Sequence, residues 1–420
     1  MLKQTNKLTD SIRIRMLLRS TNAVEAFIQH RMTGEGQQNV FTPFDLCQEI
    51  VDKLKENGGL VGNIGVLFNI EFLEVLVSRY GIKSSDITIF VDDKVKFEFC
   101  KKHYEMEPGK NLFQINIEKS IKEKDLWTTE GKNNMKFDVI IMNPPYQAPV
   151  LKSKTDRGSK GSRNVIWPEF VNMAIVDVKD NGFLAAIHPP KWRKPEDKLF
   201  KIMTEQNITY LEMHSKKDGI KTFGAMTPFD WYILQKAKYS GKTNIKCTDG
   251  AYQTIDLREF PFLPSCDLKK VTNLLAKNKD EKCEVLYSYS FHETRKPWMS
   301  EIKTDKFVYP CVHSTTKDKV RYWYSSTNKN GFFCIPKVIF GDNGGDTGIF
   351  NAIVDMEGVF GITQHAMAIP ISSKDEGEQI KKALESESFK KIINSCQYGG
   401  FQIDWRMFPY FRKDFWKEFI

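Results

Sequence analysis

The sequence predicts an α/β protein in which a doubly wound, mostly parallel sheet is followed by a mixed α/β domain. Short apolar segments of strand length alternate with amphipathic segments of helix length from Gly58 to about residue 240. Beyond that point, turns rich in Gly, Asn and Asp and short aromatic segments replace the alternation. The 420 residues also exceed what one hydrophobic core usually serves, which indicates more than one domain.

The expected elements follow in order along the chain. Residues 1–40 carry apolar side chains at helical spacing, and Pro43 stands where the helix 44–56 can begin. The expected strands are 61–68, 87–91, 111–115, 137–142, 182–187, 208–213 and 229–234, and helices are expected over 71–79, 94–103 and 167–178. This pattern divides the chain into a helical segment 1–38, a first domain 39–240 and a second domain 241–420.

Composition narrows the class of protein. The formal net charge of +9 favours a polyanionic partner such as nucleic acid. The eight cysteines are never two to four residues apart, so zinc-binding spacing is absent and no metal is expected. No apolar run is long enough to span a membrane, and the first residues lack the apolar core of a signal peptide. We therefore expect a cytoplasmic protein that does not bind membranes.

The segment with the clearest chemistry is Asn143-Pro144-Pro145-Tyr146, directly after the expected strand 137–142. Ligands of doubly wound sheets bind at the carboxyl ends of the strands. An exocyclic adenine amine is a poor nucleophile because its lone pair is delocalised into the ring. The Asn143 amide oxygen and the Pro144 carbonyl can accept from both N–H bonds, which frees the lone pair for attack on a methyl sulfonium. The prolines stiffen the loop, and Tyr146 offers a ring for a flipped-out base. An ordinary Asn-Pro-Pro turn is the alternative.

Together with its apolar strand, this segment resembles the catalytic motif of the gamma-class adenine-N6-specific DNA methyltransferases of restriction–modification systems and viruses. The resemblance covers about residues 39–236, and residues 300–420 are more loosely similar to the target-recognition regions of that family. It implies a Rossmann-like methyltransferase sheet, S-adenosylmethionine as cofactor and double-stranded DNA as substrate. The resemblance also implies a cognate restriction endonuclease as a partner. It further implies that the protein is a monomer or a homodimer and that it acts in a bacterial or virus-infected cell.

The cofactor segments match the family unevenly. In the family, the segment corresponding to Phe41-Thr42-Pro43 touches the methionyl end of the cofactor, whereas a plain helix start is the alternative here. The usual glycine-rich turn is missing, because the strand 61–68 continues into Asn69-Ile70-Glu71-Phe72. Three explanations stay open. Asn69 and Glu71 bind the cofactor in a shortened loop, the cofactor binds weakly, or the chain is inert and needs an active partner.

Two further positions are candidates for cofactor binding. Asp92 closes the strand 87–91, where an acidic side chain accepts the ribose hydroxyls in nucleoside-binding sheets, and Asp93 is the alternative acceptor. Either residue could instead cap the helix 94–103. Asn116 follows the third strand, where the family uses an aspartate for the cofactor adenine, and its amide oxygen can also accept.

The resemblance to the methyltransferase family also implies a second aromatic wall for the target base after the sixth strand. Phe223 is the first choice and Phe229 the second, and both could equally be core aromatics. His188 ends the fifth strand, but the methylated amine needs no histidine base, so a packed strand-end histidine is expected there.

Basic and amide side chains suggest the contacts to DNA. The loop 147–163 is expected to reach phosphates through Lys152, Lys154, Arg157, Lys160 and Arg163. Lys191 and Arg193 flank Trp192 after the fifth strand and suggest a second phosphate-contacting loop. In the second domain Arg321, Lys337, Asn343 and Gln364 are candidate readers of bases.

The leading hypothesis is therefore a site-specific DNA adenine-N6 methyltransferase. An RNA N6-adenine methyltransferase on the same scaffold and a non-catalytic DNA-binding subunit of a modification complex are the alternatives. The second alternative follows from the missing glycine turn, and the binding of S-adenosylmethionine would distinguish it from the leading hypothesis.

Overall fold

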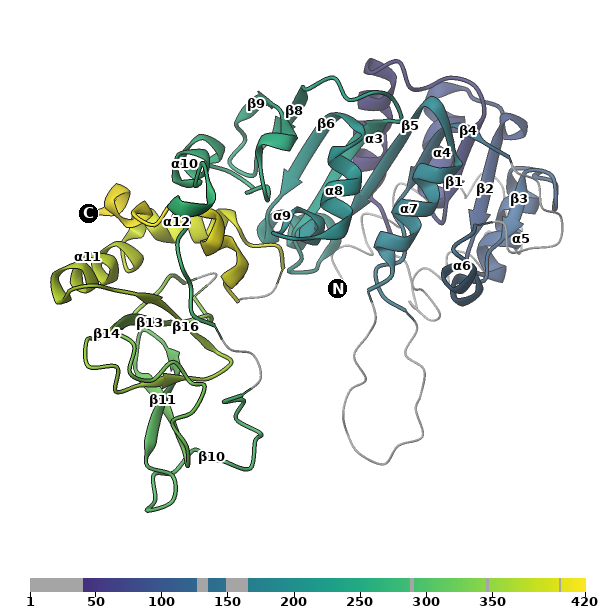
Figure 1. Ribbon diagram of the computed structural model, residues 1–420. Helices are drawn as coiled ribbons and strands as arrows, with labels where there is room; N and C mark the ends of the chain where they lie inside the picture. Colours follow the sequence, from purple (N-terminus) through teal and green to yellow (C-terminus); the bar gives the residue numbers. More distant parts are fainter. Residues whose placement is uncertain (1–40, 127–134, 149–164, 288–290, 345–346, 400–401) are drawn as a thin grey trace. The chain divides into compact units, whose positions relative to one another are not determined.

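The computed structural model describes residues 41–126, 135–148, 165–287, 291–344, 347–399 and 402–420 (Figure 1). The expected helical segment 1–38 lies outside these residues. The chain forms two compact units. The first runs as far as Pro190 and includes Lys201–Arg258, and the second comprises Lys191–Phe200 and Glu259–Ile420.

A nine-stranded sheet organises the first unit, in the order β3-β2-β1-β4-β5-β7-β6-β8-β9. Strands β1 to β5 pair in parallel, and β7 runs antiparallel between β5 and β6. The strands are β1 Ile64–Leu67, β2 Ile87–Val91, β3 Leu112–Gln114, β4 Phe137–Met142, β5 Val178–His188, β6 Asn207–His214, β7 Phe229–Gln235, β8 Thr243–Lys246 and β9 Tyr252–Ile255. The expected doubly wound, mostly parallel sheet is confirmed.

Helices connect these strands and cover both faces of the sheet. They are α3 Phe44–Glu56, α4 Ile70–Tyr80, α5 Lys94–His103, α6 Ile117–Glu123, α7 Trp167–Asp177 and α9 Lys216–Phe223, with the short 3-10 turn η1 Ser84–Asp86. The elements η2 Pro190–Arg193, α8 Lys198–Thr204 and η3 Leu257–Glu259 lie where the chain passes between the two units. Apolar side chains of α3, α4 and α5 share one core with alternate residues of the sheet, whereas α7 lies on the opposite face (Figure 1). Burial on both faces explains why the residues of β1, β2 and β4 are mostly apolar.

Strands β8 and β9 extend the sheet beyond residue 240, the boundary that the sequence suggested. Tyr210 of β6 pairs with Asn244 of β8 in parallel register, and β8 and β9 form an antiparallel pair. The fading alternation of this region reflects exposed edge strands, because β9 alternates exposed and half-buried residues. The first unit accordingly ends at Arg258.

The second unit is mixed α/β, as expected. It contains a four-stranded sheet, β10-β12-β11-β15, and a three-stranded sheet, β14-β13-β16. The elements are α10 Leu268–Leu274, β10 Met299–Ser300, β11 Tyr309–Thr315, β12 Val320–Ser325, β13 Lys337–Gly341, β14 Ile353–Asp355, β15 Gly361–Ile362, β16 Ala366–Pro370, α11 Lys374–Leu384, α12 Glu387–Ser395 and the 3-10 turns η4 Lys279–Glu281, η5 Trp405–Tyr410 and η6 Phe415–Phe419.

Aromatic side chains from the end of the chain build the main core of this unit. Phe408, Phe411 and Phe415 pack against one another with ring centroids 5.5–6.1 Å apart. Among the described residues of the whole chain, none of the helices combines the length and apolar character needed to cross a membrane.

Candidate active site

The segment Asn143-Pro144-Pro145-Tyr146 directly follows β4, at the carboxyl edge of the sheet. β4 pairs in parallel with β1, with Met142 opposite Leu67, so the residues that follow these two strands are neighbours. Asn143 is completely buried. The position expected for a ligand-binding edge therefore holds a buried amide rather than an exposed turn.

Three predicted segments meet at this amide through hydrogen bonds. The Asn143 backbone N–H donates to Asn69 Oδ1 over 3.0 Å, and Asn143 Nδ2 donates to Thr42 Oγ1 over 3.0 Å. Asn69 Nδ2 donates to the same Thr42 Oγ1 over 3.4 Å. Thr42, Asn69 and Asn143 are 0, 1 and 0% exposed. Buried hydrogen bonds of this kind hold both the backbone and the amide plane of Asn143 in one orientation.

Tyr146 is half-buried with a deeply buried hydroxyl. Its backbone carbonyl accepts a hydrogen bond from the Ile166 N–H over 3.1 Å, which ties the loop to the start of α7. The hydroxyl has no hydrogen-bond partner among the described residues. Burial raises the pKa of Tyr146, so the hydroxyl stays protonated at neutral pH. The predicted phosphate contacts Lys152, Lys154, Arg157, Lys160 and Arg163 lie outside the described residues.

The turn from β1 into α4 is short and contains no glycine. Phe68 adopts φ +71°, a left-handed conformation that glycine normally takes, and Asn69 then stands at the N-cap of α4. Phe68 is buried and packs edge-on against Phe170 with centroids 4.9 Å apart. Gly62 precedes β1 and has φ +70°, whereas Gly65 lies within β1, where a Cβ would be 3.1 Å from the Phe137 ring.

The acidic residues after β2 are both engaged within the chain. Asp93 is the N-cap of α5, and its Oδ1 accepts from the Lys96 N–H over 2.8 Å. Asp92 Oδ1 lies 2.6 Å from Lys96 Nζ, and the side chains of this ion pair are only 3 and 2% exposed. The same Nζ donates to the Phe68 carbonyl over 3.3 Å. Asp93 therefore caps the helix, as the alternative interpretation held. Asp92 is linked through Lys96 to the Phe68 carbonyl in the β1–α4 turn.

The remaining cofactor candidates differ in accessibility. Glu71 lies buried in the first turn of α4, where the helix dipole favours a carboxylate. Asn116 is exposed at the N-cap of α6, and its Oδ1 accepts from the Lys119 N–H over 3.0 Å. Phe41 packs edge-on against Phe44, and Pro43 is the N-cap of α3, so this segment is also the helix start that we considered as an alternative.

The two phenylalanines proposed for a second aromatic wall contact each other. Phe223 is the half-buried last residue of α9 and lies edge-on to Phe229, with centroids 4.9 Å apart. Phe229 is buried in the sheet core and stacks on His214 with centroids 4.2 Å apart. Because Phe229 is buried and Phe223 is only half-buried, Phe223 is the better candidate for contact with a base.

His188 is packed, as expected from its position. It stacks on Trp167 with centroids 4.1 Å apart, and its Nε2 lies 3.2 Å from the Tyr232 hydroxyl. Its Nδ1 lies 3.0 Å from the Pro189 carbonyl. Both ring nitrogens therefore have partners within the chain, and the ring orients the end of β5.

Two predicted DNA contacts are corrected by their burial. Arg193 is 1% exposed, donates from a guanidinium N–H to the Leu263 carbonyl over 2.9 Å and lies over the Tyr398 ring. Lys337 is 0% exposed and pairs with Asp355 over 2.8 Å. Side chains that are buried and paired in this way cannot reach DNA phosphates or base edges, so neither residue is retained among the contacts.

The other predicted contacts keep accessible positions. Lys191 and Arg321 are exposed. Asn343 lines a cavity of about 480 Å³ together with Lys317 and Lys390, and its buried Oδ1 has no partner among the described residues. Gln364 is half-buried and bonds to Thr294 through both ends of its amide, which limits its reach to a base.

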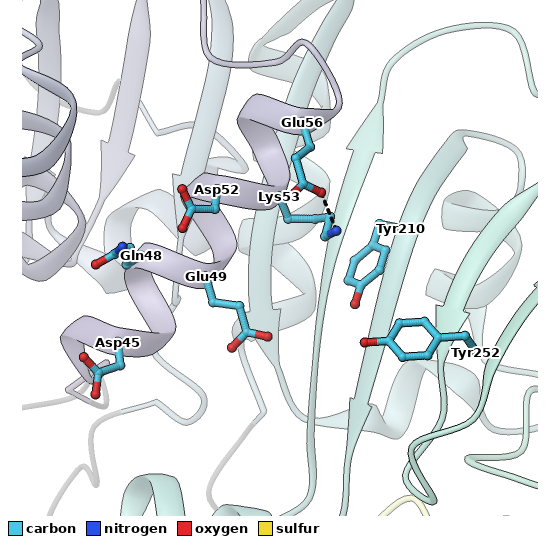
Figure 2. Close-up of a pocket in the computed structure, with 8 residues that line it drawn as sticks. All are labelled: Asp45, Gln48, Glu49, Asp52, Lys53, Glu56, Tyr210 and Tyr252. Carbon is cyan, nitrogen blue, oxygen red and sulfur yellow. Dashed lines mark hydrogen bonds and ion pairs between the residues drawn. The ribbon is translucent and has the colours of Figure 1, made fainter.

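A second cavity, of about 450 Å³, lies along α3 and was not expected from the sequence. Figure 2 shows Asp45, Glu49 and Asp52 of α3 on one side and Tyr210 and Tyr252 on the other. Burial, and then the nearby Glu212, raise the pKa of Glu49. In the sequence, Asp45, Glu49 and Asp52 are spaced so that they lie on one side of a helix, and this spacing could have indicated an acidic face. Carboxylates at these positions repel phosphates, so this face is not among the proposed DNA contacts.

Comparison with known proteins agrees with this fold. No curated protein sequence matches the chain. A type I restriction–modification methyltransferase subunit from Streptococcus thermophilus is 15% identical over 55% of this chain and 53% of its own, with a TM-score of 0.38. DrdV, solved in complex with DNA, is 10% identical over 93% of this chain and 57% of its own, with a TM-score of 0.50. The chain thus spans little more than half the length of these two proteins. At 10% identity, the similarity to DrdV concerns the fold alone.

A protein-family model gives the more specific match. The model described as Eco57I restriction-modification methylase matches residues 37–217. That range includes Thr42, Asn69 and Asn143, whose hydrogen bonds join the three segments of the site. The resemblance to restriction–modification methyltransferases, first inferred from the catalytic segment, is confirmed at this level. The match covers less than half of the chain, and over residues 37–217 the chain is similar to the Eco57I restriction-modification methylase family.

Proposed function

We propose that the protein is a site-specific, gamma-class DNA adenine-N6 methyltransferase. The observation that carries the proposal is the buried Asn143 amide after β4, oriented by Thr42 and held through its backbone by Asn69. This network lies within the range that matches the restriction-modification methylase family. The side-chain amide is bonded to Thr42 and the backbone N–H to Asn69, so two segments distant in the sequence hold this residue at the end of β4.

The chemistry of the proposal depends on two acceptors. Because Asn143 Nδ2 donates to Thr42, the amide plane is set and Oδ1 is the atom that faces the target amine. Oδ1 and the Pro144 carbonyl accept one N–H each, which concentrates the lone pair on the adenine nitrogen. The prolines at 144 and 145 limit backbone motion, so these acceptors need little reorganisation. The Tyr146 ring, neutral and half-buried, stacks on the flipped base.

S-adenosylmethionine, the cofactor in this proposal, supplies an electrophilic methyl group. The residue types at the strand ends fit it, because Glu71 and Asp92 are carboxylates near the ends of β1 and β2. Asp92 is suited to ribose hydroxyls and Glu71 to the ammonium of the methionyl end. Thr42 and Asn69 border the same edge and hold the catalytic loop against it.

The proton of the methylated amine leaves to water in this proposal. A secondary ammonium formed on an adenine ring is strongly acidic, so no protein base is needed. His188 is consistent with this, since both of its ring nitrogens have partners in the chain.

Double-stranded DNA is the proposed substrate. The net charge of +9 favours a polyanion, and exposed Lys191 and Arg321 offer phosphate contacts. Asn343 and Lys317, at the cavity of the second unit, offer groups that can read base edges. DrdV, which shares the fold, was solved with DNA. A target-recognition role for residues 241–420 and a partner restriction endonuclease belong to the same proposal.

Transfer of a labelled methyl group tests the proposal. The full chain is incubated with S-adenosylmethionine labelled in its methyl group and with genomic DNA that lacks adenine methylation, and the nucleosides are then separated. We expect the label in N6-methyl-2′-deoxyadenosine. A parallel reaction with RNA distinguishes the RNA methyltransferase, and label in RNA alone would contradict the proposal.

A non-catalytic DNA-binding subunit is the second candidate. The observation in its favour is the β1–α4 turn, where Phe68 replaces the expected glycine and Asp92 is ion-paired with Lys96. This candidate predicts DNA binding without any binding of S-adenosylmethionine. Calorimetric titration of the cofactor into the full chain decides between the two.

A further inference from the structure

A buried lysine ammonium lies between the ends of β1 and β2. Lys96 Nζ is 2.6 Å from Asp92 Oδ1, 3.7 Å from Asp93 Oδ2 and 3.3 Å from the Phe68 carbonyl. Only 2% of the Lys96 side chain is exposed. The ammonium therefore joins Phe68, which directly follows β1, to Asp92, which directly follows β2.

This location is where a doubly wound sheet binds a nucleoside. β1 and β2 are parallel neighbours, with Leu67 opposite Phe90, and the Phe68 N–H donates to the Phe90 carbonyl over 2.7 Å. Nucleosides lie across the carboxyl ends of such strands, and an acidic side chain after the second strand accepts the ribose hydroxyls. Lys96 donates to the carboxylate of Asp92 at this place, as a ribose would.

The backbone of the β1–α4 turn supports the same interaction. Phe68 adopts φ +71°, a conformation that costs free energy for a residue with a side chain. Its carbonyl accepts from Lys96, and its ring packs on Phe170. The short turn and the lysine thus stabilise each other, which gives a physical reason why the turn holds without glycine.

We propose that Lys96 is an internal competitor of the cofactor, so that S-adenosylmethionine binds only when the ammonium leaves Asp92. The inference rests on the proposed function and adds a regulatory element to the same site. Charged partners at this distance in a buried place are strongly coupled, so the ion pair lowers the affinity for any ligand that needs Asp92. A neutral residue at position 96 leaves the carboxylate available and raises that affinity.

Calorimetric titration of the full chain with S-adenosylmethionine and with S-adenosylhomocysteine tests this inference. Lys96→Met should bind both ligands at least about tenfold more tightly than the natural chain. Asp92→Asn should bind them more weakly, because it removes the acceptor. The free Lys96→Met protein should melt at a lower temperature, because Asp92 is left buried without its cation, and ligand should restore more of its stability.

Two further variants keep the test decisive. Lys337→Met removes the cation of an equally buried ion pair in the second unit, with Lys337 Nζ 2.8 Å from Asp355, and controls for general destabilisation. It should lower the melting temperature without altering the affinity. Lys96→Gln keeps a donor for the Phe68 carbonyl and replaces Lys96→Met if that variant does not fold.

The outcomes separate the inference from the proposed function. If the natural chain binds the cofactor and methylates DNA while neither Lys96 variant binds more tightly, the inference is wrong and the function stands. If no folded variant binds the cofactor and no methyl group reaches DNA, both are overturned. Tighter binding by Lys96→Met and unchanged binding by Lys337→Met support the inference.

Discussion

Asn143 Nδ2 donates a 3.0 Å hydrogen bond to Thr42 Oγ1, although the two residues are 101 positions apart in the sequence. Both side chains are fully buried. A side-chain amide offers an oxygen and a nitrogen of nearly the same shape, so its chemistry depends on which of them faces the substrate. In this structure Thr42 Oγ1 accepts from the amide nitrogen of Asn143, and we propose Thr42 as a positioning residue of the proposed reaction.

Thr42→Val should lower kcat about 5- to 100-fold, since it removes one buried hydrogen bond and keeps the shape of the side chain. The amide of Asn143 then loses the acceptor that sets its orientation. KM for S-adenosylmethionine should change little if the role of Thr42 is to orient Asn143. Steady-state kinetics of methyl transfer give both constants.

Thr42→Ser is the matched control, because it restores the hydroxyl without the methyl group. It should recover most of the lost kcat. A Thr42→Val protein with normal kcat and a raised KM for the cofactor would instead favour the cofactor contact that the family resemblance implies.

Tyr146→Phe should keep methyl transfer within about threefold of the natural rate, because stacking on a base depends on the ring and not on the hydroxyl. The hydroxyl has no hydrogen-bond partner among the described residues. Tyr146→Ala removes the ring and should lower the rate about 10- to 100-fold. Single-turnover kinetics on duplex DNA measure both, and a large loss in Tyr146→Phe would argue against a stacking role.

Arg193→Ala should lower the free energy of unfolding by about 2–4 kcal/mol, because a buried guanidinium is lost together with its hydrogen bond to Leu263. Denaturant unfolding measures this change. Lys191→Ala, at an exposed position two residues earlier, should leave that free energy unchanged. If Lys191 contacts a phosphate, its variant should reduce the salt dependence of DNA binding by about one counterion. Unaltered stability of Arg193→Ala would refute the structural role.

His313 should make the second unit sensitive to mild acid. Burial first, and then the nearby His365 and Arg321, lower the pKa of His313 from 6.5 to about 4. The unfolded chain therefore binds a proton between these values that the folded chain does not, so this contribution to stability is complete above pH 6.5 and is lost as the pH falls toward 4. His313→Gln should flatten the dependence of unfolding free energy on pH in that window. An equally steep dependence in the variant would contradict this assignment.

The sheet and the catalytic loop were predictable because they are encoded locally. Apolar runs such as 137–142 have the length and composition of buried parallel strands, and the Asn-Pro-Pro-Tyr segment follows one of them directly. The hydrogen bonds among Thr42, Asn69 and Asn143 were only partly predictable from the sequence. Each segment could be named, whereas hydrogen bonds between residues 74 and 101 positions apart depend on tertiary structure.

Basic residues were the least predictable part of the site. Arg193, Lys337 and Lys96 have the same local signature as surface cations, yet each is buried with a partner from another segment or the next turn. Charge alone does not distinguish a phosphate contact from a buried ion pair, because burial depends on which carboxylates or carbonyls the fold brings near. The spacing of Asp92 and Lys96 within one helical turn was the one local sign of their pairing.

Methyl transfer by an Asn143→Ala variant tests the proposed role of the buried amide. Duplex DNA without adenine methylation is incubated with S-adenosylmethionine carrying a deuterated methyl group and with either the natural chain or Asn143→Ala, and N6-methyl-2′-deoxyadenosine is quantified by mass spectrometry. We expect labelled product from the natural chain and a loss of at least about 100-fold in Asn143→Ala, with DNA binding retained. Equal product from the two proteins, or label only in another nucleoside, would contradict the account.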